Sequence, residues 1–249
     1  MARRISPIQQ PKVSLVPALR APRLDIARGL AIVVMLAFHF TYDLSYWHFI
    51  EADFYRDSFW LNLRTGIVSA FLLVMGISLS VADTQGSPRK MRRVLILVAA
   101  AVLISVVSFL LFKQRFIFFG VLHFIALASV LAVFFVKRPT LALIVGGLCL
   151  FVGNFWQHPL FDQPALQWIG LVTRKPLTED YVPLLPWFGV VLLGCALGKL
   201  LPPAVLFSPV GKNPLLQNLA VLGRHSLAVY LLHQPLFFGT LWGMRQVLG

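Results

Sequence analysis

Seven runs of apolar residues divide the chain, and polar segments separate them. A helix that crosses a bilayer needs about 20 predominantly apolar residues. The runs lie at roughly 24–46, 58–82, 91–112, 115–136, 139–156, 182–201 and 217–242. This pattern predicts an all-α fold, a polytopic integral membrane bundle of about seven transmembrane helices.

The polar segments alternate in charge from one run to the next, with basic residues at one set of ends and most acidic residues at the other. The basic residues are Arg3, Arg4, Lys12, Arg20, Arg23, Arg89, Lys90, Arg92, Arg93, Lys137, Arg138, Lys199 and Lys212. The acidic residues are Glu51, Asp53, Asp57, Asp162, Glu179 and Asp180. Because cytoplasmic loops carry an excess of lysine and arginine, the N-terminus is predicted to be cytoplasmic. Residues 1–22 are interpreted as a flexible tail, and 23–249 as a single transmembrane domain.

Composition supports a membrane protein and argues against a nucleic-acid-binding one. Of 249 residues, 58% are hydrophobic and only 12% are charged, whereas a soluble domain is close to a quarter charged. The mean hydropathy is +0.80. The formal net charge of +13 resides mainly in short segments beside apolar runs, which is a topology signal. We therefore expect a multi-pass protein in contact with membrane lipid, with a bacterial inner membrane favoured, and no nucleic-acid partner.

The first apolar run, LDIARGLAIVVMLAFHFTYDL, carries the ionisable residues Asp25, Arg28, His39 and Asp43. Successive helix residues advance by about 100°, so Arg28, His39 and Asp43 share one face, and Asp25 can pair with Arg28. Since lipid disfavours charged side chains, this stripe is predicted to face the bundle interior. Arg28 is placed near the cytoplasmic end and His39 roughly 16 Å further along the helix. Asp43 could hydrogen-bond one imidazole nitrogen of His39. The alternative is an interfacial ion pair with a core histidine.

Two further histidines fall at a similar predicted depth. His123 lies in FGVLHFIALAS and His233 in LAVYLLHQPLF. With His39 they suggest a polar cavity, and a zinc site of three histidines is a weaker alternative. No local metal-ligand motif is present, and Cys149 and Cys195 both lie inside apolar runs, so no metal is expected.

The pattern Asp25-x-x-Arg28-Gly29, followed by His39, resembles the first helix of the transmembrane acyltransferase superfamily. Later segments resemble the bacterial branch related to heparan-alpha-glucosaminide N-acetyltransferase. These segments are FLLVMGISLS at 71–80, FGVLHFIAL at 119–127, DYVPLLPWFGVVLLG and GRHSLAVYLLHQPL. Their order along the chain is stronger evidence for the resemblance than any single segment.

This resemblance implies an acyltransferase that uses acetyl-CoA from the cytoplasm and a hydroxyl or amine of a glycan or envelope acceptor on the outer face. It implies that His39 is a general base or a transient acyl carrier, and that Arg28, beside Asp25, contacts the CoA. Asp43, His123 and His233 complete the expected catalytic set. Arg92 and Arg93, in the cluster that begins at Arg89, could bind CoA phosphates, because arginine makes bidentate phosphate contacts. A topology signal beside anionic lipid is the simpler account of that cluster.

Two other classes of function remain open from the residues alone. A non-catalytic transporter or channel could use the histidines and Asp43 as a proton or anion path. An accessory subunit could merely scaffold a cell-envelope complex.

Overall fold

The computed structural model describes residues 21–84, 90–209 and 211–248. Within them the fold is all-α, as predicted, with nine α-helices and short 3₁₀ turns. The helices are α1 Pro22–Tyr46, α2 Ser58–Thr84, α3 Lys90–Phe112, α4 Val121–Leu131, α5 Pro139–Phe155, α6 Leu184–Leu200, α7 Pro203–Phe207, α8 Pro214–Arg224 and α9 Ser226–Leu248. The predicted tail lies outside the described residues except at its last two positions.

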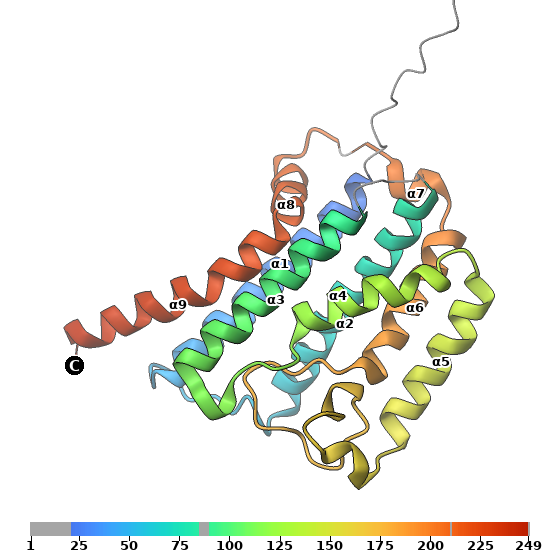
Figure 1. The fold of residues 1–249 in the computed structure, drawn as a ribbon. Helices are drawn as coiled ribbons and strands as arrows, with labels where there is room; N and C mark the ends of the chain where they lie inside the picture. The colour runs from blue at the N-terminus through green and yellow to red at the C-terminus, as the bar shows by residue number, and fades with distance from the viewer. Residues whose placement is uncertain (1–20, 85–89, 210, 249) are drawn as a thin grey trace, which may run out of the picture.

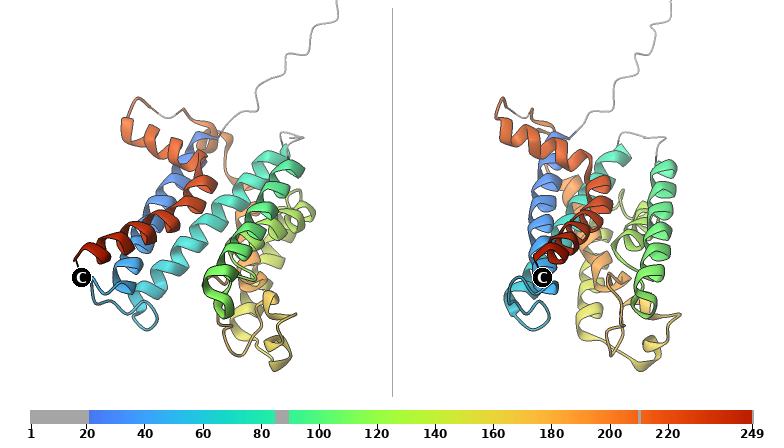
Figure 2. Two further views of the ribbon diagram at one scale, coloured as in Figure 1. Left: turned by 60° about the vertical axis from the view of Figure 1, so that its left-hand side comes forward. Right: turned by 90° about the vertical axis from the view of Figure 1, so that its left-hand side faces the viewer.

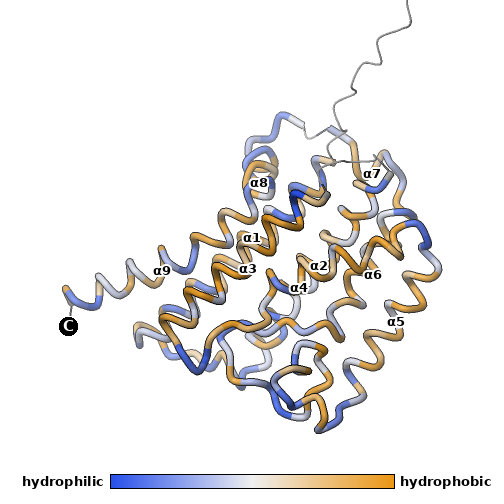
Figure 3. Tube along the Cα trace, in the orientation of Figure 1, coloured by the Kyte–Doolittle hydropathy of each residue, from blue (hydrophilic) through white to orange (hydrophobic). Residues whose placement is uncertain are grey.

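Three helices, α1, α2 and α3, are long and apolar enough to cross a membrane, and the helices around α4, α5 and α6 are apolar but shorter. Figure 3 shows apolar residues along the helices and hydrophilic ones in many of the connections. The exposed side chains of α3 and α5 include large apolar residues such as Leu103, Phe109 and Ile144, which suits a lipid-facing surface. These are the helices of a multi-pass membrane protein.

The predicted run 217–242 is not one helix. It is divided into α8 and α9 at His225, whose φ of −99° and ψ of 18° end α8. The polar triplet Arg224-His225-Ser226 occupies the break, and serine favours helix starts over helix interiors. The run 115–136 also differs, because its helical core is the short α4 and extended backbone precedes it.

The helices form a connected series in which α1 packs against α2, α8 and α9, while α6 packs against α2 and α5. Figures 1 and 2 show α9 running beside α1 and ending at one side of the molecule. The starts of α1 and α3 lie at one end, and the 47–57 and 156–183 connections lie at the other (Figure 1). This arrangement agrees with the alternation of loops read from the charge pattern.

Glycines allow the closest helix crossings. A Cβ on Gly29 would collide with the backbone carbonyl of Leu219, and one on Gly223 would collide with that of Asp25, so α1 and α8 touch through their backbones. Small residues at helix contacts permit this approach in membrane proteins. The crossing fixes α8 against the turn of α1 that carries Arg28.

The C-terminal end of α1 is closed by a Schellman motif. The N–H of Phe49 donates to the carbonyl of Leu44 at 2.9 Å, and the N–H of His48 donates to that of Ser45 at 3.0 Å. The motif needs a left-handed residue, and His48 supplies it with a φ of 62°. Glycine is the usual residue at such a position.

Candidate active site

The ionisable stripe of α1 faces the protein interior, as the spacing predicted. Ile32, Met35 and Asp43 on this face are 0%, 4% and 1% exposed. His39 is half-buried, and the Arg28 side chain is 21% exposed. The polar groups of the helix are therefore directed toward its neighbours α2 and α9.

Arg28 is held by two partners at the end of α1 where the chain enters the bundle. Its guanidinium donates to Asp25 Oδ1 at 2.6 Å and to Ser78 Oγ, on α2, also at 2.6 Å. Ser78 Oγ in turn donates to the carbonyl of Val74 at 2.6 Å. The predicted Asp25–Arg28 pair is confirmed. Ser78 was not predicted individually, although it lies in the FLLVMGISLS segment.

Further positive charge gathers near Arg28. Arg93, on the first turn of α3, lies close enough for its charge to interact unfavourably with that of Arg28. Arg92 and Arg93 are exposed, and Arg89 lies outside the described residues. Two cations brought together from α1 and α3 form a suitable environment for a phosphate group.

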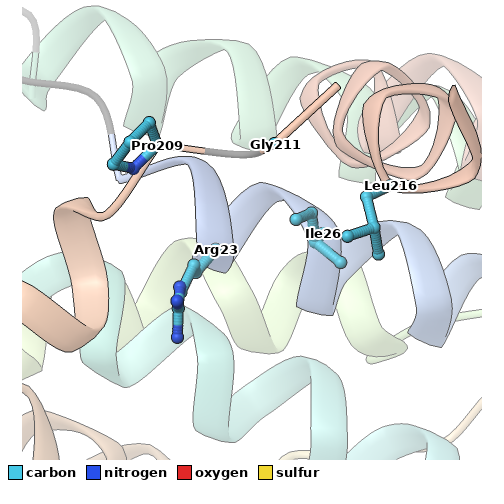
Figure 4. A pocket seen from close by; sticks show the side chains of 5 residues that line it. All are labelled: Arg23, Ile26, Pro209, Gly211 and Leu216. Carbon is cyan, nitrogen blue, oxygen red and sulfur yellow. The ribbon is translucent and has the colours of Figure 1, made fainter. Parts of the chain in front are cut away.

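A surface cleft of about 310 Å³ opens at the same end of the molecule. Its lining residues are Arg23, Ile26, Pro209, Gly211 and Leu216, which Figure 4 shows between the start of α1 and α8. Arg23 is the charged residue among them. The cleft is lined mainly by apolar groups and does not include His39.

His39 and His233 face each other across the contact between α1 and α9, with ring centroids 4.9 Å apart and ring planes inclined by 58°. His233 is 5% exposed, and its Nδ1 lies 2.7 Å from the carbonyl oxygen of Tyr230. Because a carbonyl only accepts, Nδ1 carries the proton and Nε2 keeps a free lone pair. That Nε2 is buried and has no hydrogen-bond partner. The prediction that these two histidines share one level is confirmed.

Asp43 pairs with α9 and not with His39. Its Oδ1 accepts a long hydrogen bond of 3.5 Å from Gln234 Nε2, and within the described residues no hydrogen bond joins it to His39. The hydrogen bond considered for Asp43 and His39 is therefore not formed. Asp43 Oδ2, Gln234 Oε1 and the indole nitrogen of Trp47 are also buried without partners.

The unpartnered atoms are informative as a group. Buried polar atoms are nearly always hydrogen-bonded, so a cluster of exceptions requires an explanation such as a bound ligand or water. Three of the five such side-chain atoms in the described residues belong to α1 or α9, and a fourth, Trp47 Nε1, belongs to the residue that directly follows α1. The fifth is Ser80 Oγ on α2. The α1–α9 contact is therefore the candidate site.

His123 lies apart from the other two histidines. Its Nδ1 accepts the backbone N–H of Gly120 at 3.3 Å, and its Nε2 lies 3.0 Å from Ser105 Oγ on α3. Ser105 Oγ donates to the carbonyl of Ile117 at 2.6 Å. Both imidazole nitrogens are thus occupied: Nδ1 caps the start of α4, and Nε2 joins α4 to α3. The structure does not bring His123 into the pair, and the described residues contain no group of three or more His, Cys, Asp or Glu side chains that could hold a metal.

The connection from 156 to 183 folds over the end of the bundle opposite the start of α1 (Figure 1). Its final part pairs with residues before α4: Val182 N–H donates to the carbonyl of Phe119 at 3.3 Å, and Glu179 forms a 2.9 Å ion pair with Arg115. Asp180 Oδ2 accepts the N–H of Val121 at 2.8 Å, at the start of α4. Desolvation of this half-buried carboxyl group raises the pKa of Asp180 from its ordinary value.

Fold and site together define a multi-pass membrane protein in which one helix carries a partly buried arginine near its start and one member of a facing histidine pair further along. Comparison with protein-family models matches residues 20–235 to the heparan-alpha-glucosaminide N-acetyltransferase catalytic family. The chain belongs to this family. Comparison with curated proteins and with solved structures found no similar protein. Family membership implies acetyltransferase activity with acetyl-CoA as donor and a glucosamine-type acceptor.

Proposed function

We propose that this protein transfers an acetyl group from cytoplasmic acetyl-CoA to an amine of a sugar-like acceptor on the outer face of the membrane. The observation that supports this most strongly is the facing pair of His39 and His233, set among buried acceptors without partners, in a chain of an acetyltransferase family. We also propose that residues 23–249 form one catalytic domain.

The donor enters at the basic end. Arg28 is already oriented by Asp25 and Ser78, and it points its charge toward the same region as Arg93. These two arginines hold phosphate groups of CoA by charge-assisted hydrogen bonds. The pantetheine chain then extends along the interior face of α1. His39 lies eleven residues beyond Arg28, roughly 16 Å along the helix, where the thioester would be placed.

The hydrogen-bonding character of the site favours an amine over a hydroxyl acceptor. Three of the unpartnered atoms are acceptors, namely His233 Nε2, Asp43 Oδ2 and Gln234 Oε1. A primary amine, or its ammonium form, offers two or three N–H donors, whereas a hydroxyl offers one. The amine therefore satisfies more of the buried acceptors, and unsatisfied buried acceptors each cost about 1–3 kcal/mol.

In the proposed reaction the neutral amine nitrogen attacks the thioester carbonyl carbon. The new C–N bond forms, the C–S bond breaks, and CoA leaves as its thiolate. His233 Nε2 has the fixed lone pair that accepts the proton of the attacking nitrogen, and the thiolate then takes that proton as the thiol. His39, in ring contact with His233, is the imidazole nearest to the path from Arg28 and orients the thioester. If His39 carries the acetyl group transiently, a covalent acetyl-imidazole forms before the amine attacks.

An aromatic surface at the outer end of α1 suits a sugar ring beside this site. Tyr42 Oη and Tyr55 Oη are 2.9 Å apart, and Tyr55 is 62% exposed. Behind them, Phe54 and Trp60 stack with centroids 4.2 Å apart. Binding sites commonly combine such apolar walls with a few polar groups that set orientation.

The test is acetyl transfer by protein reconstituted in liposomes, with acetyl-CoA and glucosamine on opposite sides. We expect CoA release that depends on glucosamine, abolition by His233→Ala, and strong reduction by His39→Ala. The matched control is His123→Ala, because His123, like His39, is a half-buried histidine but lies outside the pair. Full transfer by both His39→Ala and His233→Ala would refute the proposed site. Proton flux without CoA release would instead identify a channel or transporter.

A further inference from the structure

Helix α9, which carries His233, is attached to the rest of the protein by few polar contacts. Within the described residues its side chains make two hydrogen bonds to other elements: Gln234 to Asp43, and Tyr230 to Asp180. These bonds lie on either side of His233 along the helix. Both therefore help to set the direction in which His233 points.

Tyr230 lies where two apolar clusters meet. Its ring packs against the cluster around Leu122 and Ala126, which joins α3 to α4, and also against the cluster around Met35 and Phe38. Its phenol donates to Asp180 Oδ2 at 3.4 Å. Its backbone carbonyl is the acceptor that fixes the tautomer of His233. One residue thus connects the outer connection 156–183 to the histidine pair.

Asp180 is itself anchored. The same Oδ2 accepts the N–H of Val121 at the start of α4, and Gly120 leaves the space that the carboxylate occupies. A negative charge is favourable at a helix N-terminus. Lys175 and Arg64 also interact with Asp180 through their charges. Asp180 is consequently a firm attachment point for Tyr230.

The segment after His233 is less constrained. Pro235 lies inside α9 and has no N–H to donate to the carbonyl of Leu231. The turn that carries His233 therefore lacks one of its backbone hydrogen bonds on the C-terminal side. Its orientation depends more strongly on the contact made one turn earlier, at Tyr230.

We propose that Tyr230 and Asp180 are positioning residues that hold the imidazole of His233 in place facing the imidazole of His39. They act through His233 and touch neither substrate. Because a displacement of about 1 Å can reduce a rate by up to about 100-fold, loss of this contact should lower kcat. The KM for acetyl-CoA should be unchanged, since the Arg28 end of α1 is untouched. This inference rests on the proposed function for its kinetic consequences but not for its geometry.

The kinetic test compares four variants in the full-length protein. Tyr230→Phe and Asp180→Ala should each lower kcat about tenfold with KM for acetyl-CoA within twofold of wild type. Asp180→Asn should keep kcat near the wild-type value, because an amide oxygen still accepts from Tyr230 and Val121. Tyr181→Phe is the matched control. It loses a phenol hydrogen bond of 2.6 Å to the carbonyl of Gln167 in the same connection, without a contact to α9.

A second measurement does not require activity. In a background that carries His39→Cys and His233→Cys, with Cys149 and Cys195 replaced by alanine, oxidative cross-linking reports the distance between the two positions. Adding Tyr230→Phe should slow cross-linking several-fold, and adding Tyr181→Phe should not. If wild type transfers no acetyl group but cross-linking depends on Tyr230, the proposed function fails and the positioning inference stands. Wild-type kcat and unchanged cross-linking in Tyr230→Phe would overturn the inference, as would equal losses in Tyr181→Phe.

Discussion

Two aspartates on the same helix should respond in opposite ways to the same substitution. Asp43 is 1% exposed, accepts one long hydrogen bond, and keeps Oδ2 buried without a partner. Asp25 instead forms a 2.6 Å ion pair with Arg28, and the two side chains are 15% and 21% exposed. We predict that Asp43→Asn stabilises the protein and that Asp25→Asn destabilises it.

The magnitude for Asp43→Asn follows from the contacts of the two oxygens. The amide oxygen can still accept from Gln234 Nε2, and the NH₂ group replaces the unpartnered Oδ2 with a donor beside a residue whose own Oε1 lacks one. Removing one unpartnered buried charge-bearing oxygen recovers about 1–3 kcal/mol. For a chain of 150–250 residues each 1 kcal/mol shifts Tm by about 2–4 °C. We therefore expect Tm to rise by several degrees.

The magnitude for Asp25→Asn has the opposite sign because Arg28 remains partly buried and loses its counter-charge. Exposed pairs contribute up to about 1 kcal/mol and buried ones cost about 3–5 kcal/mol when one partner is removed. The intermediate exposure of this pair suggests a loss of about 1–3 kcal/mol. Asp25→Asn should also raise the KM for acetyl-CoA, because Arg28 is no longer held in place.

The assay is thermal unfolding of each variant in one detergent, at one protein concentration, followed by acetyl transfer in liposomes. Asp43→Asn should combine a higher Tm with a lower kcat, the combination expected when an unfavourable buried group is retained for function. A lower Tm with unchanged kcat in Asp43→Asn would show that Asp43 is a structural residue and would refute the reasoning. Equal changes of Tm in Asp43→Asn and Asp25→Asn would show that the unpartnered Oδ2 of Asp43 does not destabilise the folded protein.

Further predictions concern stability and substrate binding at separate places. His123→Ala should lower Tm, since it removes the hydrogen bond to Ser105 on α3 and the capping hydrogen bond from Gly120 at the start of α4, while kcat per folded molecule stays near wild type; a kcat loss without a Tm loss would contradict this. Gly29→Val should destabilise by at least about 1–3 kcal/mol through its collision with Leu219, measured as Tm, and the same substitution at the open Gly147 should not. His48→Gly should stabilise the protein by about 1 kcal/mol, because glycine adopts a φ of 62° without the steric cost that histidine has there. Chemical denaturation would measure this gain in the free energy of unfolding. Arg28→Lys should raise the KM for acetyl-CoA more than it lowers kcat, because lysine cannot donate to two partners through a planar fork.

Hydrophobic patterning was sufficient to predict the class of fold and which face of the first helix is turned toward the protein interior. The runs at 24–46, 58–82 and 91–112 are long, continuous helices within a residue or two of those limits. A continuous apolar run leaves few alternatives to a helix when the surroundings are lipid. The stripe of Arg28, His39 and Asp43 faces inward because helical periodicity and the cost of exposing charge to lipid together determine it.

The apolar pattern predicted the wrong structure where one apolar run does not form one continuous helix. The run at 217–242 is divided at His225, and the run at 115–136 contains extended backbone before α4. In both, the division depends on contacts made by other elements, such as the packing of α8 on Gly29 and the pairing of Phe119 with Val182. Local composition does not encode those contacts.

The sequence by itself determined an all-α membrane protein, the membership of Arg28, His39 and Asp43 in one face, and a family resemblance that the comparison with family models confirmed. Only the tertiary structure decided which partners those residues have. In the folded protein His233 lies against His39, Asp43 accepts a hydrogen bond from Gln234, and His123 hydrogen-bonds to Ser105. The physical reason is that spacing along one helix fixes direction and depth, whereas pairing between helices depends on crossings such as Gly29 with α8 and on attachments such as Tyr230 with Asp180.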